Sequence, residues 1–340
     1  MSFAALKRIA PGVGLAAAVG VVSVLIALAE ERVFGHPVIE GLVVAILLGM
    51  VIRTLWEPPE MVDAGVRFTA KQVLEAAVFL LGASIDLPLL LRAGPALAVS
   101  IVLLVVLGIL ASFAIGRSLG LPRKLAILVA CGNGICGNSA IAAIAPVIHA
   151  DREHVASSIA FTAILGVIVV VGLPFLVGPL HLSFYQYGVL AGLTVYAVPQ
   201  VLAAAFPVSA LSGQVGTLVK LVRVLMLGPV VLFFALRNRG TAGASGTRPR
   251  FALTRFVPWF IIGFMLLAAL RSLGVLSDAW ATGARTLSVW LTVAAMAALG
   301  LGVDVRVVKR VGRPVIATVS ASLAVLIVLA LTLIHGLGIR

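Results

Sequence analysis

The chain has 340 residues, of which 62% are hydrophobic and 11% charged, and its mean hydropathy is +1.21. Because a soluble domain carries roughly 25% charged residues, this composition excludes an ordinary soluble globule and indicates a lipid environment. The formal net charge of +13 would suggest nucleic acid as the partner of a soluble protein, but in a membrane protein it first indicates topology.

Eleven apolar runs are long enough to be membrane helices, because about 20 residues at 1.5 Å rise cross the hydrocarbon. The predicted spans are residues 9–29, 37–55, 73–91, 95–116, 124–149, 155–178, 186–205, 217–236, 256–274, 286–304 and 314–335. The first resembles a signal peptide, but its apolar core exceeds the usual length of about 7–15 residues, so a retained helix is expected. The sequence therefore predicts an all-α, polytopic membrane protein that forms a single transmembrane domain over residues 1–340.

Within that domain, three segments are distinguished by composition. Residues 9–236 hold the first eight spans, residues 237–255 form a basic linker with five Arg, and residues 256–340 hold the last three spans. Assigning successive loops to alternate sides puts seventeen of the 25 Lys and Arg residues on the side of the N-terminus and the linker. The positive-inside rule then makes this side cytoplasmic, in a bacterial inner membrane.

An internal repeat relates the third and tenth spans. Residues 76–94 align with residues 294–312, and the alignment pairs Asp86 with Asp304. The two spans run in opposite directions in the predicted topology, and inverted repeats are typical of secondary transporters with a site at the midplane. A generic helix end followed by Gly could produce a few of these matches by chance. Asp86 and Asp304 are retained as candidates for coupling to an ion.

A Gly- and Asn-rich block lies in the middle of the fifth span, at residues 130–140. Its glycines and asparagines each weaken a helix, so the block predicts an interrupted helix at membrane depth, where broken backbone must line a cavity or be buried in protein. A second half-helix capped by Asn138 or Ser139 would present free amides that favour an anion. Close helix packing through small residues is the structural alternative. The candidate binding residues are Gly132, Asn133, Gly134, Gly137, Asn138 and Ser139.

The seventh and eighth spans supply further polar candidates. Pro199 predicts a kink, and Tyr196 and Gln200, four residues apart, share one helix face and are candidate substrate ligands, although a purely structural kink fits equally. Lys220 and Arg223 lie on one face of the eighth span, and no Asp or Glu occurs between residues 154 and 277. A charge within the membrane needs a partner. We therefore expect the two cations to attract or gate an anion, with snorkelling to the interface as the alternative.

Other chemistries have weaker support. The fifth span contains no carboxylate for a proton relay, although its Asn, Ser and carbonyl groups could ligate sodium. Asp86 and Asp304 superficially suggest an aspartyl protease, but the topology places them near opposite faces of the membrane. Neither a nucleophile elbow nor an HExxH motif occurs. The chain is therefore not expected to be an enzyme or to hold a metal or cofactor.

Residues 131–143 resemble the YeiH-type family of sulfate exporters, with further matches at residues 192–204, 220–223, 258–260 and 294–304. The resemblance covers about residues 10–335 and implies a sulfur oxyanion as substrate. Two departures stand out: Tyr196 occupies a position where the family often has His, and Asn133, Gly134 and Asn138 replace the more usual Thr, Ser and Ala.

The Gly-rich break is more distantly similar to the superfamily of bile-acid symporters and sodium/proton antiporters. That similarity implies crossed broken helices that move against a panel domain. It would place the second broken helix at the tenth span, whereas the Pro-containing candidate is the seventh, so both remain open.

The sequence thus predicts a secondary transporter that exports a small anion, with sulfate or a related sulfur oxyanion as the substrate suggested by the resemblance. The alternatives are a sodium- or proton-coupled organic-anion transporter, an intramembrane hydrolase, and a membrane scaffold or sensor that binds a ligand without transporting it. The expected partners are the anionic substrate, the lipid bilayer and a coupling ion, with homo-oligomerisation left open and no nucleic acid.

Overall fold

The computed structural model describes residues 3–34, 41–56, 58–84, 94–237, 259–304, 306 and 313–338. The regular elements of this part are all helical, which confirms the all-α prediction. They form two compact units: unit 1 is Met1–Leu90 with Phe260–Val307, and unit 2 is Leu91–Trp259 with Val308–Arg340. The predicted linker at 237–255 lies outside the described residues, except for Arg237.

Within the described residues, six helical segments are long and apolar enough to cross a membrane. They are Lys7–Arg32, Ala96–Ser118, Arg152–Leu176, Ala210–Arg237, Asp278–Leu301 and Arg313–Gly336, and two shorter apolar helices are Gly41–Leu55 and Trp259–Ser272. A polytopic membrane protein is therefore supported. The inverted repeat stays a prediction, because most of residues 85–94 and 305–312 lie outside the described residues.

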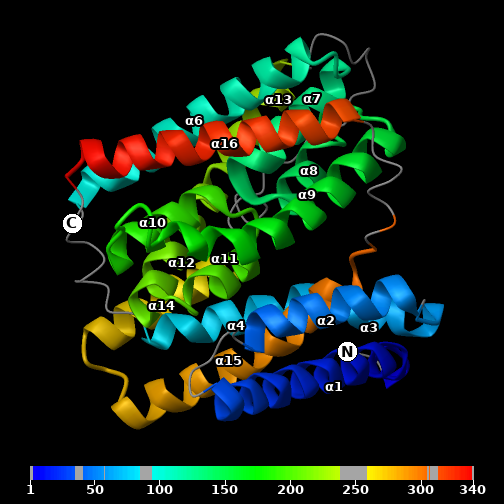
Figure 1. Cartoon of the computed structure of the whole chain (residues 1–340), viewed down its shortest axis with the longest axis vertical. Helices are drawn as coiled ribbons and strands as arrows, with labels where there is room; N and C mark the ends of the chain where they lie inside the picture. The colour runs from blue at the N-terminus through cyan, green and yellow to red at the C-terminus, as the bar shows by residue number, and fades with distance from the viewer. Residues whose placement is uncertain are drawn as a thin grey trace. The chain divides into compact units, whose positions relative to one another are not determined.

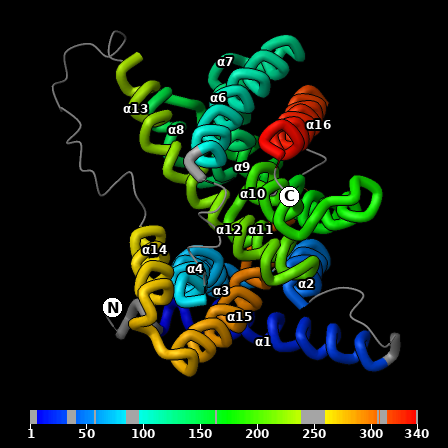
Figure 2. The backbone as a smooth tube through the Cα atoms, turned by 90° about the vertical axis from the view of Figure 1, so that its left-hand side faces the viewer, coloured from blue at the N-terminus to red at the C-terminus, as the bar shows by residue number. Residues whose placement is uncertain are grey.

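Unit 1 contains the N-terminal helices and two helices from late in the chain (Figure 1). Its elements are α1 (Phe3–Phe34), α2 (Gly41–Leu55), α3 (Glu60–Phe68), a π-turn (Thr69–Val73), α4 (Leu74–Leu81), a 3-10 turn (Gly82–Ser84), α14 (Trp259–Ser272) and α15 (Asp278–Leu301). Figure 2 shows α4, α14 and α15 together.

Glycines allow the helices of unit 1 to pack backbone against backbone. A Cβ atom on Gly49 of α2 would lie 2.4 Å from the carbonyl oxygen of Ala297 in α15, and one on Gly65 of α3 would lie 2.0 Å from that of Ile9 in α1. Such contacts between small residues are typical of helices that associate in lipid. The first contact joins α2 to α15, and the second joins α3 to α1.

Unit 2 contains the segments with the predicted site. Its elements are α6 (Gly94–Ser118), α7 (Arg123–Cys131), a π-turn (Gly132–Cys136), α8 (Asn138–Ile144), α9 (Arg152–Gly172), a 3-10 turn (Leu173–Leu176), α10 (Phe184–Thr194), α11 (Val198–Ala205), α12 (Ala210–Leu225), α13 (Leu227–Arg237) and α16 (Arg313–Gly336). Helices α6 and α16 lie side by side (Figure 1), with Gly116 near Thr318 and Gly108 near Leu326, so they are antiparallel.

The Gly-rich block forms the tip of a helical hairpin, here called the first hairpin (residues 123–149). Its π-turn is closed by the hydrogen bond from Gly137 N to Gly132 O, 2.9 Å long, and Gly137 has φ +64°, which favours glycine. The chain then folds back, as shown by the hydrogen bond that Lys124 Nζ donates to His149 O at 2.6 Å. A continuous helix would separate these residues by more than about 35 Å.

Residues 184–205 form the second hairpin, with its tip at residues 195–197. Helix α10 ends at Thr194, the backbone is extended at Val195 and Ala197, and α11 begins at Val198. Tyr187 Oη donates to Ala204 O at 2.7 Å, so the two arms lie against each other. Pro199 thus lies in the first turn of α11, where its missing N–H costs nothing, instead of kinking a continuous helix.

Helices α9 and α12 run from one end of unit 2 toward the other, and each passes the tips of both hairpins. Helix α9 starts at the base of the first hairpin, reaches its tip at Thr162, which donates to Asn138 Oδ1, and then contacts the second hairpin at Gly166. Helix α12 starts at the base of the second hairpin, where Ser212 Oγ donates to Phe184 O at 2.7 Å. The hairpins therefore enter unit 2 from opposite ends.

These contacts correct two of the predicted spans. Interruption of the fifth span is confirmed, but residues 124–149 and 186–205 each return to the end at which they start and do not pass through unit 2. The prediction failed because helical periodicity and length are the same for a span and for two short antiparallel arms.

The two hairpins predict on which side of the membrane their flanking residues lie. In vesicles of known orientation, we expect single cysteines at Leu119 and Arg152 to react with a membrane-impermeant maleimide from one side, and cysteines at Gly178 and Ala210 from the other. The native Cys131 and Cys136 are buried and serve as the unlabelled background. Opposite sidedness of residues 119 and 152 would contradict the first hairpin, and opposite sidedness of residues 178 and 210 the second.

Candidate functional site at the hairpin tips

Helix α12 passes close to both hairpin tips because glycines line its contact with α10. A Cβ atom on Gly188 would lie 2.8 Å from Ser212 O, and one on Gly192 would lie 2.6 Å from Gly216 O. The backbones of α10 and α12 are therefore in contact over two successive turns. This approach carries the next turns of α12, with Lys220 and Arg223, to the end of α10, and both side chains are completely buried.

Lys220 connects the two tips. Its Nζ donates to Ile135 O in the first hairpin at 2.6 Å and to Val195 O in the second at 2.8 Å. Both carbonyls are released from ordinary helical bonding, one in the π-turn and the other just past the end of α10. One ammonium group thus satisfies acceptors from segments that are 60 residues apart in the chain.

Arg223 makes the same connection with more bonds. Its Nη2 donates to Asn133 O at 2.9 Å and to Gly134 O at 3.0 Å, both in the first hairpin. Its Nη1 donates to Gly192 O at 2.9 Å and also to Leu193 O, both in the second. The planar guanidinium is suited to such divergent donation, whereas a Lys offers only a point charge.

The partners of the two cations are therefore carbonyls, and the expected anion is not needed to satisfy their hydrogen bonds. The charge is only partly balanced, however. A helix C-terminus carries about half a negative elementary charge, so the ends of the first arms of both hairpins offset roughly one of the two positive charges when Lys220 is protonated. Neither cation forms an ion pair with a described Asp or Glu, so the described groups of unit 2 leave part of this positive charge unbalanced.

The predicted residues of the first hairpin fall into two groups. Gly132, Asn133, Gly134 and Gly137 form the buried tip, and a Cβ atom on Gly137 would lie 3.2 Å from Tyr196 Cβ in the second hairpin. Asn133 is 1% exposed, and its Oδ1 has no hydrogen-bond partner among the described residues. A buried acceptor without a partner is uncommon, and Asn133 Oδ1 can be satisfied only by a hydrogen-bond donor.

Asn138 and Ser139 are the first residues of α8 and are exposed. Neither caps the helix, since Gly137 occupies the N-cap position without a side-chain bond, so the predicted cap is wrong. Asn138 instead accepts a hydrogen bond from Thr162 of α9. That bond fixes the turn of the first hairpin against a neighbouring helix.

Tyr196 and Gln200 lie in the second hairpin and have different surroundings. Gln200 Oε1 accepts a hydrogen bond from Ala197 N at 3.1 Å, and the amide fills the space beside Gly166. Tyr196 is 2% exposed, and its hydroxyl has no hydrogen-bond partner among the described residues. Gln200 therefore shapes the tip, whereas Tyr196 retains a free donor beside the first hairpin.

The two candidate coupling residues, Asp86 and Asp304, belong to the segments assigned to unit 1. Asp86 lies outside the described residues, and Asp304 follows α15 in unit 1. The Asp304 carboxylate accepts from Arg306 Nε at 3.0 Å, and this hydrogen bonding holds the pKa of Asp304 below its ordinary value. Asp304 is therefore ionised at neutral pH and poorly suited to carry a proton, or to act as the protonated partner of an aspartyl dyad.

Sequence reasoning missed the residues that hold the hairpins in shape. Thr162 and Tyr187 are buried and donate to the first and second hairpin, respectively. Ser112 of α6 accepts from Asn133 Nδ2 at 3.5 Å. The only available signal was a polar side chain within an apolar run, which Ser and Thr often satisfy within their own helix.

We expect Arg223→Leu to destabilise the protein strongly. It would leave carbonyls of both tips unpaired, and each buried unsatisfied group costs about 1–3 kcal/mol. In detergent, the midpoint of thermal unfolding should fall by roughly 10 °C or more, and Arg223→Lys should recover only part of this loss. The control Lys124→Met removes one bond at the surface and should have little effect. An unchanged midpoint in Arg223→Leu would contradict the role of Arg223.

Comparisons with known proteins agree with a membrane protein. The family model Conserved hypothetical protein 698 matches residues 11–318. UPF0324 membrane proteins of Bradyrhizobium diazoefficiens (53% identical; 97% of this chain, 95% of the relative), Brucella suis (53%; 100% of both) and Bacillus cereus (34%; 96% of both) are similar over nearly their whole lengths. No solved structure gives a significant match. These names indicate a bacterial multi-pass membrane protein and specify no substrate.

Proposed function

The chain belongs to the UPF0324 membrane protein family, Conserved hypothetical protein 698, and we propose that it is a secondary transporter of a small anion. The observation that carries this proposal is the meeting of two oppositely directed hairpins around Lys220 and Arg223, without a carboxylate between residues 154 and 277. Interrupted helices with their ends at membrane depth are a recurrent way to build a transport site.

The preference for an anion follows from the charge balance at the tips. Two buried cations exceed the charge that two helix C-termini offset, and a buried surplus charge is costly unless a counter-ion is present. An anion near the tips would neutralise the surplus without competing for the carbonyls. Lys220 and Arg223 thus act as fixed charges that favour the anion, while other groups form its direct hydrogen bonds.

Tyr196 is the strongest candidate for a direct ligand. Its buried hydroxyl is a donor without a partner among the described residues, its Cβ lies beside Gly137 of the first hairpin, and an oxyanion accepts from such donors. Asn133 and the exposed Asn138 and Ser139 lie on the facing hairpin. Sulfate or a related sulfur oxyanion, moved by alternating access, is the substrate class favoured by the resemblance in residues 131–143, and the direction is export.

The orientation follows from the same hairpins. Residue 152 joins residues 123, 124, 237 and 313 at one end of unit 2, so in the described part of the unit this end collects the positive charges other than Lys220 and Arg223. By the positive-inside rule it faces the cytoplasm. The first hairpin then enters from the cytoplasmic side and the second from the opposite side.

We expect Tyr196→Phe to reduce the flux of labelled sulfate into proteoliposomes by about 10- to 100-fold, because a hydrogen bond to a charged group contributes about 1.5–3 kcal/mol. Its thermal stability should not change, since the hydroxyl has no partner among the described residues. Tyr185→Phe is the matched control that should keep full flux.

Three results of the flux measurement would change the proposal. Flux that requires a sodium or proton gradient would favour a cation-coupled anion transporter, and transport of another anion in place of sulfate would reject only the substrate. Wild-type flux of every tested anion in both Tyr196→Phe and Ser139→Ala would reject the tip as the binding site.

A further inference from the structure

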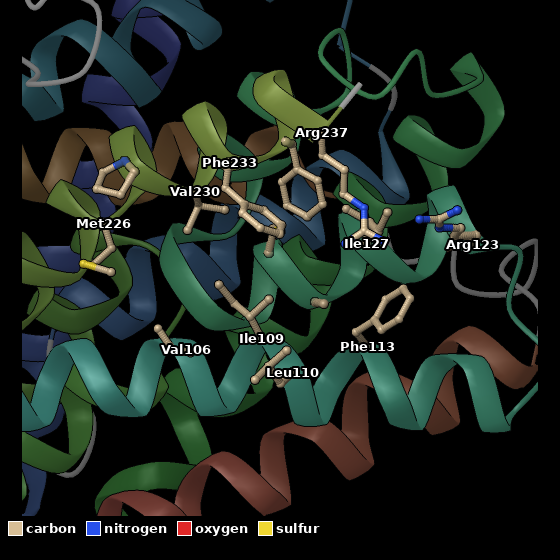
Figure 3. A pocket seen from close by; sticks show the side chains of 14 residues that line it. Val106, Ile109, Leu110, Phe113, Arg123, Ile127, Met226, Val230, Phe233 and Arg237 are labelled. Atoms are coloured by element: carbon tan, nitrogen blue, oxygen red, sulfur yellow. The ribbon is translucent and has the colours of Figure 1, made fainter. Parts of the chain in front are cut away.

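A lateral cavity in unit 2 lies beside the first arm of the first hairpin and is lined there by Ile127, Ala130 and Cys131. It has a volume of about 510 Å³ and is bounded by α6, α7 and α13 (Figure 3). Its walls are apolar, with Val106 and Ile109 on α6, Ile127 on α7 and Phe233 on α13. Val106 and Phe233 are 42% and 55% exposed, so the cavity opens toward the surroundings of the helices.

Two arginines occupy one end of this cavity. Arg123 begins α7 and Arg237 ends α13, and Figure 3 shows both at the end opposite Met226. Neither side chain forms a hydrogen bond or an ion pair with a described residue, and both are exposed. The cavity therefore combines an apolar body with a cationic mouth.

The length of the cavity matches one leaflet of a bilayer. Met226 to Arg237 spans about 16 Å at 1.5 Å per residue, roughly half of the ~30 Å hydrocarbon thickness. Met226 lies one turn from Arg223, at the level of the tips, and Arg237 lies at the positively charged end of the unit. A lipid chain from that leaflet would run from the mouth to the level of the tips.

We propose that this cavity binds an anionic phospholipid, with its phosphate on Arg123 and Arg237 and one acyl chain along α6 and α13. Charge complementarity selects this occupant, because basic pockets between helices on the positively charged side of a membrane protein bind anionic headgroups. A zwitterionic lipid supplies the same chain but no net charge. The chain would contact Ile127, Ala130 and Cys131, and so would hold the first hairpin in its present position.

Native mass spectrometry of the purified full-length chain tests this proposal independently of transport. In mild detergent, the wild type should retain one phosphatidylglycerol at concentrations that leave no phosphatidylcholine bound. The double variant Arg123→Gln/Arg237→Gln and the cavity-filling Val106→Trp should each weaken phosphatidylglycerol retention at least tenfold.

Each control variant makes the same kind of substitution as its test variant, but at a position outside the cavity. Arg152→Gln/Arg313→Gln removes two exposed arginines at the same end of unit 2, and Val99→Trp places the same ring on a 66% exposed site of α6 outside the cavity. Both should bind phosphatidylglycerol within twofold of the wild type. Equal retention of the two lipids, displacement by equimolar oleate, undiminished binding in the cavity variants or equal loss in the controls would each overturn the proposal.

Discussion

The arrangement of unit 2 depends on one constraint: carbonyl groups released where helices end inside a membrane protein need hydrogen-bond donors, and buried cations need acceptors. Lys220 and Arg223 meet both needs at once, since they bond to carbonyls at residues 133–135 and 192–195. In lipid, a buried charge without a partner and a carbonyl without a donor each cost several kcal/mol. Pairing the cations with the carbonyls removes both costs. The cations and the tips therefore stabilise one another.

Other features of the fold follow from bringing these groups together. Gly188 and Gly192 let α12 approach α10 closely enough for its cations to reach the tips, and Gly137 permits the reversal that places the first tip beside the second. Thr162 and Tyr187 then fix the hairpins. The positive surplus left at the tips links this architecture to the proposed anion, and the proposed lipid cavity borders Ile127, Ala130 and Cys131 of the first hairpin.

Local chemistry made some of this predictable from the sequence. The Gly and Asn residues at 132–138 indicated a break, and the absence of carboxylates indicated that Lys220 and Arg223 have unusual partners. The return of each hairpin was missed, because the packing of its two arms against each other, visible where Lys124 meets His149, leaves no trace in periodicity. The carbonyl partners were missed for a related reason: Arg223 and Asn133 are 90 residues apart, and every sequence contains carbonyls at every position.

Hydrogen–deuterium exchange in Arg223→Leu tests most directly whether one side chain holds both tips. We predict that amides in residues 131–137 and in residues 192–198 exchange at least tenfold faster than in the wild type, because local opening follows the loss of local bonds. Peptides of α15 in unit 1 should be unchanged, Lys220→Met should repeat the pattern, and Lys124→Met should leave both tips protected. Wild-type exchange at both tips, or acceleration at only one of them, would contradict the account.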